Sequence, residues 1–228
     1  MDFLNNILFV PLNILPFYVL ALVIGFTVHE FSHAYFANKF GDPTAKMLGR
    51  VTLNPAAHVD LLGLVLLLIA GFGWARPVPV NRANFHRPRL MGIIVSAAGP
   101  VSNLLLALIT VIIYYGLNYF GVIGSFANNR IDIAIVTFVQ YMVLMNCFLF
   151  IFNLIPLPPL DGYRILSDWL PPRISYKLQR VEQWAMLIFL LLLFLPPLRA
   201  VTIQPLYGLA GSLSESFYTL AGYIFGGR

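Results

Sequence analysis

The chain has 228 residues, of which 59% are hydrophobic and 10% are charged, and its mean hydropathy is +0.82. Ordinary soluble domains carry about 25% charged residues, so this composition excludes a typical soluble protein. The formal net charge of +5 does not indicate a nucleic-acid partner, because Lys and Arg lie in short loops between apolar runs and form no basic stripe. We therefore expect a membrane protein whose basic residues set its orientation in the bilayer.

Several apolar stretches approach or exceed the ~20 residues that a helix needs to cross a bilayer. The first predicted helix runs from about Pro16 to Lys39 and ends at the helix-breaking sequence GDPTA. Residues 59–74 are apolar but few for a span, and they include Gly63, Gly71 and Gly73. These features favour a segment that enters the bilayer and returns. Residues 49–54 and 76–81 are predicted to be short extended strands.

Further helices are predicted over residues 91–119, 131–155 and about 182–198, with a short loop around Asn128. Residues 203–226 either span the membrane or lie at its interface. The sequence thus predicts an all-α polytopic membrane protein with about four to five transmembrane helices, a re-entrant segment and short membrane-associated β-strands. We expect a single domain over residues 1–228, with a catalytic core of about 16–166 and C-terminal helices within about 182–226.

The first helix contains the sequence HEFSH, in which His29, Glu30 and His33 follow a long apolar run. Helical geometry places the two histidines one turn apart on one face, so that both imidazoles can bind one Zn²⁺. Glu30 then lies where it can act as the general base of a hydrolytic reaction. HExxH also occurs by chance in soluble helices, but ionisable residues at membrane depth cost at least ~2.5–3.5 kcal/mol each and are functional by default.

A catalytic zinc generally has three protein ligands and an open position, so two histidines leave one ligand to be found. Of the nine acidic residues, Asp161 is the best placed, because it follows the end of the helix predicted over 131–155 and the Pro-rich turn PLPPLDG. Gly162 allows the backbone to approach closely. Asp161 could instead cap the helix that follows it, but the presence of HExxH favours the ligand.

Five separated segments together resemble the site-2 protease family of intramembrane zinc metalloproteases, in its compact prokaryotic form without a PDZ module. They are HEFSH, GDPTA…GRVTLNPAAH, WARPVPVN, AAGPVSN and FNLIPLPPLDG, and they cover roughly residues 16–166. The resemblance implies one Zn²⁺ per chain, bound by His29, His33 and Asp161, with Glu30 as the catalytic base.

The same resemblance suggests roles for three further residues. Asn153 matches an asparagine that holds the substrate backbone or the oxyanion, although its amide could equally bond a carbonyl of a broken helix. Asn54 and His58 match an NPxxH stretch, which makes them candidates for an auxiliary role, with His58 as an additional ligand or an orienting residue. His86, beside Arg87 and Arg89, is interpreted as a surface residue.

The predicted function is zinc-dependent cleavage of a transmembrane protein or peptide within the lipid bilayer, with the oligomeric state left open. The alternative is a membrane metal-binding or transport protein with a His/His/Asp site, which would not need Glu30; the intact motifs argue against a catalytically silent relative. If the ligands meet, Lys39, Lys46, Arg50, Arg76, Arg82, Arg87, Arg89, Arg164, Arg173, Lys177 and Arg180 share one side. We therefore expect a multi-pass protein of the cell membrane whose active site is toward the cytoplasm.

Overall fold

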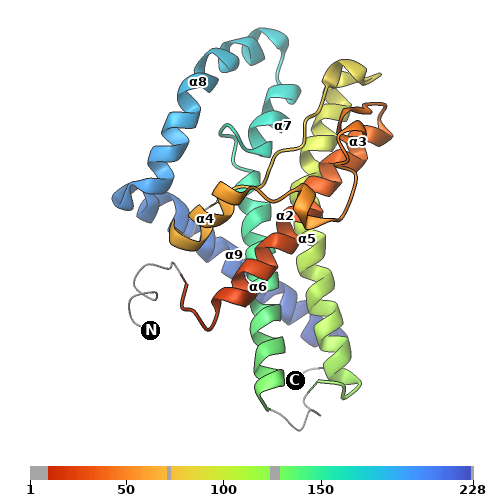
Figure 1. Ribbon diagram of the computed structural model, residues 1–228, viewed down its shortest axis with the longest axis vertical. Coiled ribbons are helices and arrows are strands. Elements are labelled where there is room, and N and C mark those ends of the chain that lie inside the picture. The colour runs from red at the N-terminus through yellow and green to blue at the C-terminus, as the bar shows by residue number, and fades with distance from the viewer. Residues whose placement is uncertain (1–9, 71–72, 124–128, 227–228) are drawn as a thin grey trace.

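The computed structural model describes residues 10–70, 73–123 and 129–226, and three long helices form its centre. Helices α2 (Leu15–Lys39), α5 (Pro88–Tyr119) and α6 (Asn129–Asn153) pack against one another in all three pairings. Figure 1 shows α5 running down and α6 returning beside it, so that α2 and α6 both end toward the top of the view. All three helices are long and apolar enough to cross a membrane.

Helix α5 shows how these helices approach one another so closely. Its buried face consists largely of small residues, namely Gly92, Val95, Ser96, Gly99, Pro100, Asn103, Ala107 and Val111. Its exposed positions include Ile94, Val101, Leu105 and Ile109. Lipid tails are as apolar as these exposed side chains, so packing between membrane helices depends on small residues that let the backbones come together. The pattern is therefore that of a helix with one face toward protein and one toward lipid.

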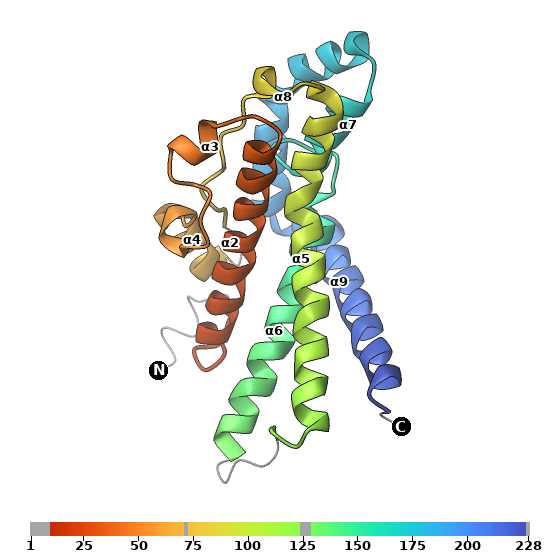
Figure 2. The same cartoon turned by 90° about the vertical axis from the view of Figure 1, so that its right-hand side faces the viewer.

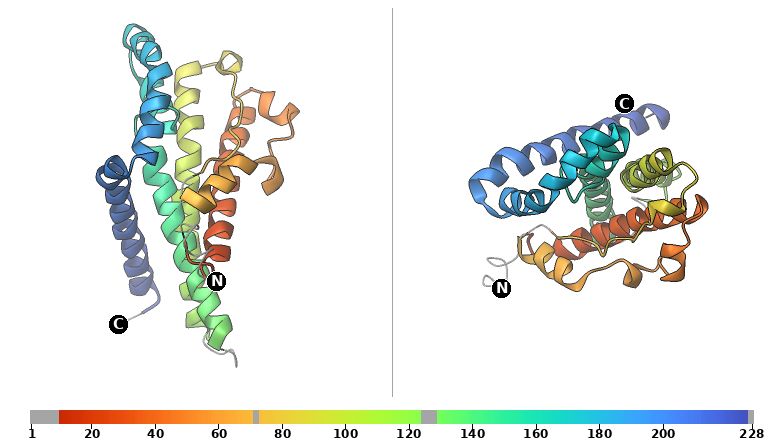
Figure 3. Two further views of the ribbon diagram at one scale, coloured as in Figure 1. Left: turned by 60° about the vertical axis from the view of Figure 1, so that its left-hand side comes forward. Right: turned by 90° about the horizontal axis from the view of Figure 1, so that it is seen from above.

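The remaining elements form a layer on each side of the α5–α6 pair (Figure 3). On the α2 side lie α3 (Thr44–Met47), the 3-10 turn η1 (Pro55–Ala57) and α4 (Leu61–Ala70), followed by a second 3-10 turn, η2 (Arg82–Asn84). On the other side lie α7 (Asp161–Trp169), α8 (Pro172–Phe194) and α9 (Pro196–Ile224). Figure 2 shows α9 alongside the lower halves of α5 and α6.

The predicted number of four to five spanning helices is not supported, because only three helices in the described part of the chain have the length and composition of a span. Helix α8 begins earlier than predicted, with Pro172 in its first turn, where proline is favoured. Its first half is therefore charged and leaves about 12 apolar residues, or ~18 Å of helix. Helix α9 has enough residues but is interrupted by polar ones such as Gln204 and Glu215.

The predicted β-strands over residues 49–54 and 76–81 are also wrong. Within the described residues, the only β-pairing is an isolated antiparallel bridge between Val59 and Ala75. Pro77 and Pro79 have no N–H to donate to a ladder. In residues 49–54, the Asn54 N–H and side chain are already used in the local turn that begins η1. Both segments are extended only in part and are held by side chains instead.

Residues 59–74 were predicted to enter the membrane and return, and the structure brings the two ends of this segment together. Val59 pairs with Ala75, and the Arg76 N–H donates to the His58 carbonyl at 2.7 Å. The ten residues of α4 extend only ~15 Å, which is half of a hydrocarbon core. The segment therefore returns to the side on which it began, while its depth in a bilayer stays a prediction. Gly71 and Asn128 lie outside the described residues. The expectation of a single domain over residues 1–228 stays a prediction.

Candidate metal centre and active site

Helix α2 brings His29, Glu30 and His33 into the protein interior near its C-terminal end. The two histidines are one turn apart, with their Nε2 atoms separated by 3.0 Å and their rings nearly perpendicular. Both are buried, at 5% and 6% exposure. The same face of α2 carries Gly25 and Ala37, whose small size lets other helices pack over it.

Asp161 reaches this pair from the turn after α6. Its Oδ2 lies 3.0 Å from the Nε2 of His29 and 3.2 Å from the Nε2 of His33. Asp161 is the first residue of α7, yet its side chain makes no capping hydrogen bond at that helix. A side chain on Gly162 would collide with the Leu154 carbonyl, so glycine is needed for the close return of the chain. The turn thus aims the Asp161 carboxylate at the histidines.

A buried chain of hydrogen bonds fixes the orientation of His29. The Asn146 amide donates to the Met142 carbonyl at 2.8 Å, so the other Asn146 side-chain atom is the oxygen, which accepts from Asn103 at 2.8 Å. The Asn103 amide also donates to the Gly25 carbonyl at 3.0 Å. The oxygen of Asn103 is therefore left to accept a hydrogen bond from Nδ1 of His29 at 2.7 Å.

His33 is oriented by the backbone of α5, because its Nδ1 lies 2.7 Å from the Val95 carbonyl. A carbonyl can only accept, so Nδ1 carries the proton. Both histidines are thus fixed in the tautomer that leaves the Nε2 lone pair free, and both lone pairs face the Asp161 oxygen. Histidines that bind metals are typically held by this kind of outer hydrogen bond.

These three atoms fit a metal ion. Asp161 Oδ2 is buried and has no hydrogen-bond partner among the described residues. As a carboxylate, Asp161 would add one negative charge to two neutral imidazoles, which is the donor set of a catalytic zinc site. Ligands at 2.0–2.1 Å from a tetrahedral zinc lie roughly 3.3 Å apart. The observed spacings of 3.0–3.2 Å are close to this value.

Gly99 on α5 leaves room for the two imidazoles. A Cβ at this position would be in collision with the His33 ring and too close to the Cε1 of His29. Any larger residue would therefore displace the histidines from Asp161. This contact gives a physical role to the glycine of the AAGPVSN segment.

Glu30 faces an extended strap, residues 75–81, that crosses the site. The Val78 N–H donates to Glu30 Oε2 at 2.9 Å. The strap is fixed on both sides of this bond: Arg50 donates to the carbonyls of Arg76 and Pro77, and the Asn81 N–H donates to Asp42 Oδ2 at 2.7 Å. The strap therefore orients the Glu30 carboxylate beside the histidines.

The structure separates the three auxiliary candidates. Asn153 lines the same cavity as Glu30 and Asp161, and its amide donates to the Leu149 carbonyl at 3.0 Å. Asn54 is exposed and caps η1. His58 is fully buried, and its Nε2 lies 2.8 Å from the Thr52 carbonyl. Neither Asn54 nor His58 joins the described group of possible metal ligands, and their auxiliary role stays a prediction.

Asn103 and Asn146 were not singled out from the sequence as orienting residues. A signal for them existed, because an asparagine in the middle of an apolar membrane helix is costly unless it has a partner. The identity of that partner depends on how α2, α5 and α6 cross, which the sequence does not give.

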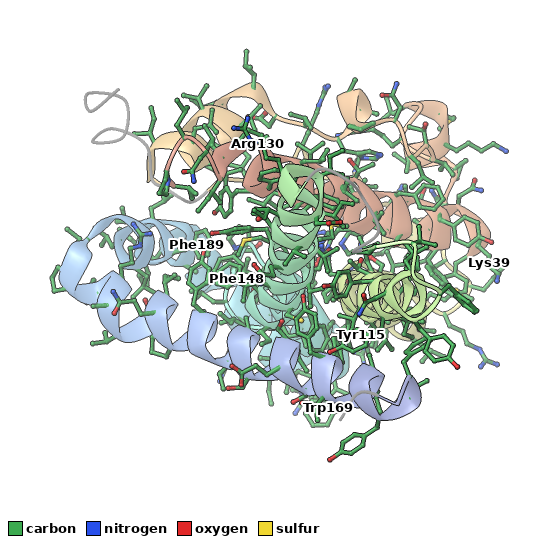
Figure 4. All side chains as sticks on the ribbon, turned by 90° about the horizontal axis from the view of Figure 1, so that it is seen from below. Lys39, Tyr115, Arg130, Phe148, Trp169 and Phe189 are labelled. Atoms are coloured by element: carbon green, nitrogen blue, oxygen red, sulfur yellow. The ribbon has the colours of Figure 1, made fainter. Side chains whose placement is uncertain are left out.

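A cavity of about 400 Å³ opens in front of the ligands, and we call it the apolar cavity. His29, Glu30, His33, Asn153 and Asp161 lie on its wall. The rest of the wall is largely aliphatic and aromatic, and includes Tyr18, Leu22, Phe148, Phe152, Phe189 and Tyr207. In Figure 4, Phe148 and Phe189 point into the same space between α6 and α8.

An HExxH pair joined by a carboxylate, with a glutamate beside an apolar cavity among membrane-type helices, defines the class of membrane metalloproteases. Comparison with known proteins supports the same class. The model of peptidase family M50, the site-2 protease family, matches residues 17–196, and the chain belongs to this family.

Two relatives illustrate the similarity. The chain is 45% identical over 205 residues to a Bacillus subtilis (strain 168) protein named "Putative zinc metalloprotease YwhC", covering 89% of this chain and 91% of that protein. It is 32% identical to Rip2 of Mycolicibacterium smegmatis, which has the same description, over 86% of this chain and 75% of Rip2. No solved structure matches. The chain is therefore a zinc metalloendopeptidase and a multi-pass membrane protein.

Proposed function

We propose that this protein cleaves transmembrane or membrane-associated peptides, using one zinc per chain held by His29, His33 and Asp161, with Glu30 as the proton-transfer residue. The convergence of the three ligand atoms within 3.0–3.2 Å of one another carries this proposal. When bound, zinc supplies a Lewis acid that lowers the pKa of a water molecule and polarises the scissile carbonyl.

Glu30 is the group that moves the proton. Its Oε2 is engaged by the Val78 N–H, which leaves the other carboxylate oxygen to accept a proton from the attacking water. The hydroxide formed in this way adds to the scissile carbonyl. The carbon–nitrogen bond then breaks as Glu30 returns the proton to the leaving amine. The fixed tautomers of His29 and His33 keep their Nε2 lone pairs available throughout.

The apolar lining of this cavity supports a substrate that is itself apolar. Its aliphatic and aromatic wall suits an unwound piece of a transmembrane helix, whereas a polar peptide would lose hydration there without compensation. Asn153 lies on this wall and is our candidate for a contact with the substrate backbone.

The distribution of basic residues supports an orientation with the active site toward the cytoplasmic side of the cell membrane. Eleven of the fourteen Lys and Arg residues are in segments on the same side as the C-terminal ends of α2 and α6, where the site lies. Single cysteines at Lys46 and Ala83, both exposed, test this topology in a Cys147→Ser background. Both should label from the same side of sealed vesicles, and labelling from opposite sides would refute the arrangement.

A cleavage assay in detergent tests the proposed function. The purified protein should cut a generic transmembrane peptide, and chelation of zinc should stop the reaction. Glu30→Gln should retain zinc and lose cleavage, while Glu215→Gln, which changes an exposed carboxylate on α9, should leave both unchanged. Turnover by Glu30→Gln near the parent rate would refute the mechanism. Bound zinc without Glu30-dependent cleavage in any substrate would favour a metal-binding or transport protein.

A further inference from the structure

A second opening, which we call the polar cleft, adjoins the apolar cavity. It has a volume of about 450 Å³ and is bordered by the strap, by the start of α5 and by Arg82 and Arg164. The two spaces share four lining residues, which are His33, Pro77, Val78 and Arg164. A peptide lying in the apolar cavity can therefore continue past the ligands into the polar cleft.

The charge of the polar cleft is positive. Asp168 is buried and forms an ion pair with Arg82. Burial raises the pKa of the Asp168 carboxyl, and Arg82, Arg89 and Arg164 all act electrostatically against that rise. Three guanidinium groups thus act electrostatically on one carboxylate, and Arg82 is the one in direct contact with it. Because Asp168 pairs directly with Arg82, a net positive charge remains beside the cleft.

Arg164 is the basic residue best placed to contact a ligand in both spaces. It lies three residues after Asp161 and therefore on the same side of α7, and it lines both spaces. Its guanidinium makes no hydrogen bond or ion pair with any residue that the structure describes. A half-buried guanidinium that feels the Asp168 charge but has no hydrogen-bonded partner is available to a ligand that brings its own negative charge.

Ser96 on α5 adds a second donor to the lining of the polar cleft. Its side chain is only 5% exposed and lines the polar cleft, and its hydroxyl has no hydrogen-bond partner among the described residues. A guanidinium and a hydroxyl facing one space match the two oxygens of a carboxylate. The cleft thus offers donors and positive charge immediately beside the ligand atoms.

We propose that the polar cleft binds a carboxylate of the substrate through Arg164, with Ser96 as a second donor. This inference rests on the proposed function and names a specificity determinant for it. The carboxylate has two possible sources, which are an acidic side chain on the aqueous side of the scissile bond and the new carboxylate that hydrolysis creates.

The first arm of the test uses transmembrane peptides that carry Glu or Gln at each successive position on the aqueous side of the cleavage site. At one position kcat/KM should be roughly tenfold higher for Glu, as expected for a charge-assisted hydrogen bond. Arg164→Gln should reduce this ratio to about one, and Arg164→Glu should instead favour a Lys peptide. Arg173→Gln, which removes an exposed charge on α8 outside both spaces, should keep the parent ratio.

The second arm compares inhibition by the N-terminal product peptide as a free acid and as an amide. If the new carboxylate is the ligand, the acid should inhibit roughly tenfold more strongly, and Arg164→Gln should remove the difference. The peptide pairs can also be tested for binding to zinc-loaded Glu30→Gln, so the outcome does not depend on cleavage. A parent protein that distinguishes neither Glu from Gln nor acid from amide overturns the proposal, even if the Arg164 variants fail to fold.

Discussion

Replacing Asn103 by alanine should weaken zinc binding although Asn103 does not touch the metal position. Asn103 is fully buried and makes three hydrogen bonds of 2.7–3.0 Å, to His29, to the Gly25 carbonyl and to Asn146. Its loss leaves the Nδ1 proton of His29 without an acceptor, so the ring can rotate or change tautomer. The Nε2 lone pair is then no longer fixed toward Asp161.

The magnitude follows from the bonds that are lost. Removing an outer hydrogen-bond partner of a metal-binding histidine typically costs ~10–100-fold in metal affinity, or about 1.4–2.8 kcal/mol. Fold stability should fall as well, by about 1–3 kcal/mol for each buried polar group left unpaired. Asn146→Ala keeps the bond between Asn103 and His29, so its effect on zinc affinity should be smaller than that of Asn103→Ala.

Competition for zinc with a chromophoric chelator measures the affinity of each purified variant. Asn118→Ala is a matched control, because Asn118 is an exposed asparagine on the same helix, α5, and is far from the site. A zinc affinity of Asn103→Ala within about twofold of the parent value would refute the argument from the hydrogen-bond chain.

Three further predictions concern the ligands, the packing around them and the loop that holds the strap. Asp161→Ala or His33→Ala should lower both activity and the zinc content found by elemental analysis; full occupancy in Asp161→Ala would mean that another residue completes the site. Gly99→Ala should also reduce zinc content, because its Cβ collides with His33, whereas Gly208→Ala, with open space around it, should not. Burial raises the pKa of Asp42, but hydrogen bonds outweigh this and lower it from 3.8. The ionised Asp42 therefore contributes its full stability at pH values above its unfolded-state pKa of 3.8, and this contribution is lost as the pH falls further. The decrease in unfolding temperature caused by Asp42→Asn should accordingly become smaller at low pH. A decrease that stays the same at every pH would contradict this.

Local sequence patterns were enough to predict which three side chains the structure brings together, while their role as ligands stays a prediction. The i, i+4 spacing of His29 and His33 on a helix is sufficient to place both imidazoles on one face. The turn before Asp161 indicated where a third ligand would come from, and the structure places its carboxylate beside both rings. These inferences need only the geometry of one helix and the direction of one turn.

Sequence patterns failed where the structure depends on contacts between distant segments. Residues 76–81 alternate Pro and Val, which resembles an edge strand, but the segment is held by Arg50, Asp42 and Glu30 and by no neighbouring strand. The roles of Asn103 and Arg164 likewise depend on helix crossings and on the position of α7. The helix predicted over about 182–198 begins instead at Pro172, which adds a charged first half to α8. Residues 203–226, for which a span and an interfacial position were both left open, lie in α9 with polar residues along it.

The ligand set is tested most directly by X-ray absorption at the zinc edge of the purified, zinc-loaded protein. We predict two imidazole ligands with nitrogen at ~2.0–2.1 Å and oxygen ligands at ~2.0–2.2 Å, in agreement with His29, His33 and Asp161. A sulfur ligand at ~2.3 Å, which only Cys147 or a methionine could supply, or a third imidazole such as that of His58, would contradict the account.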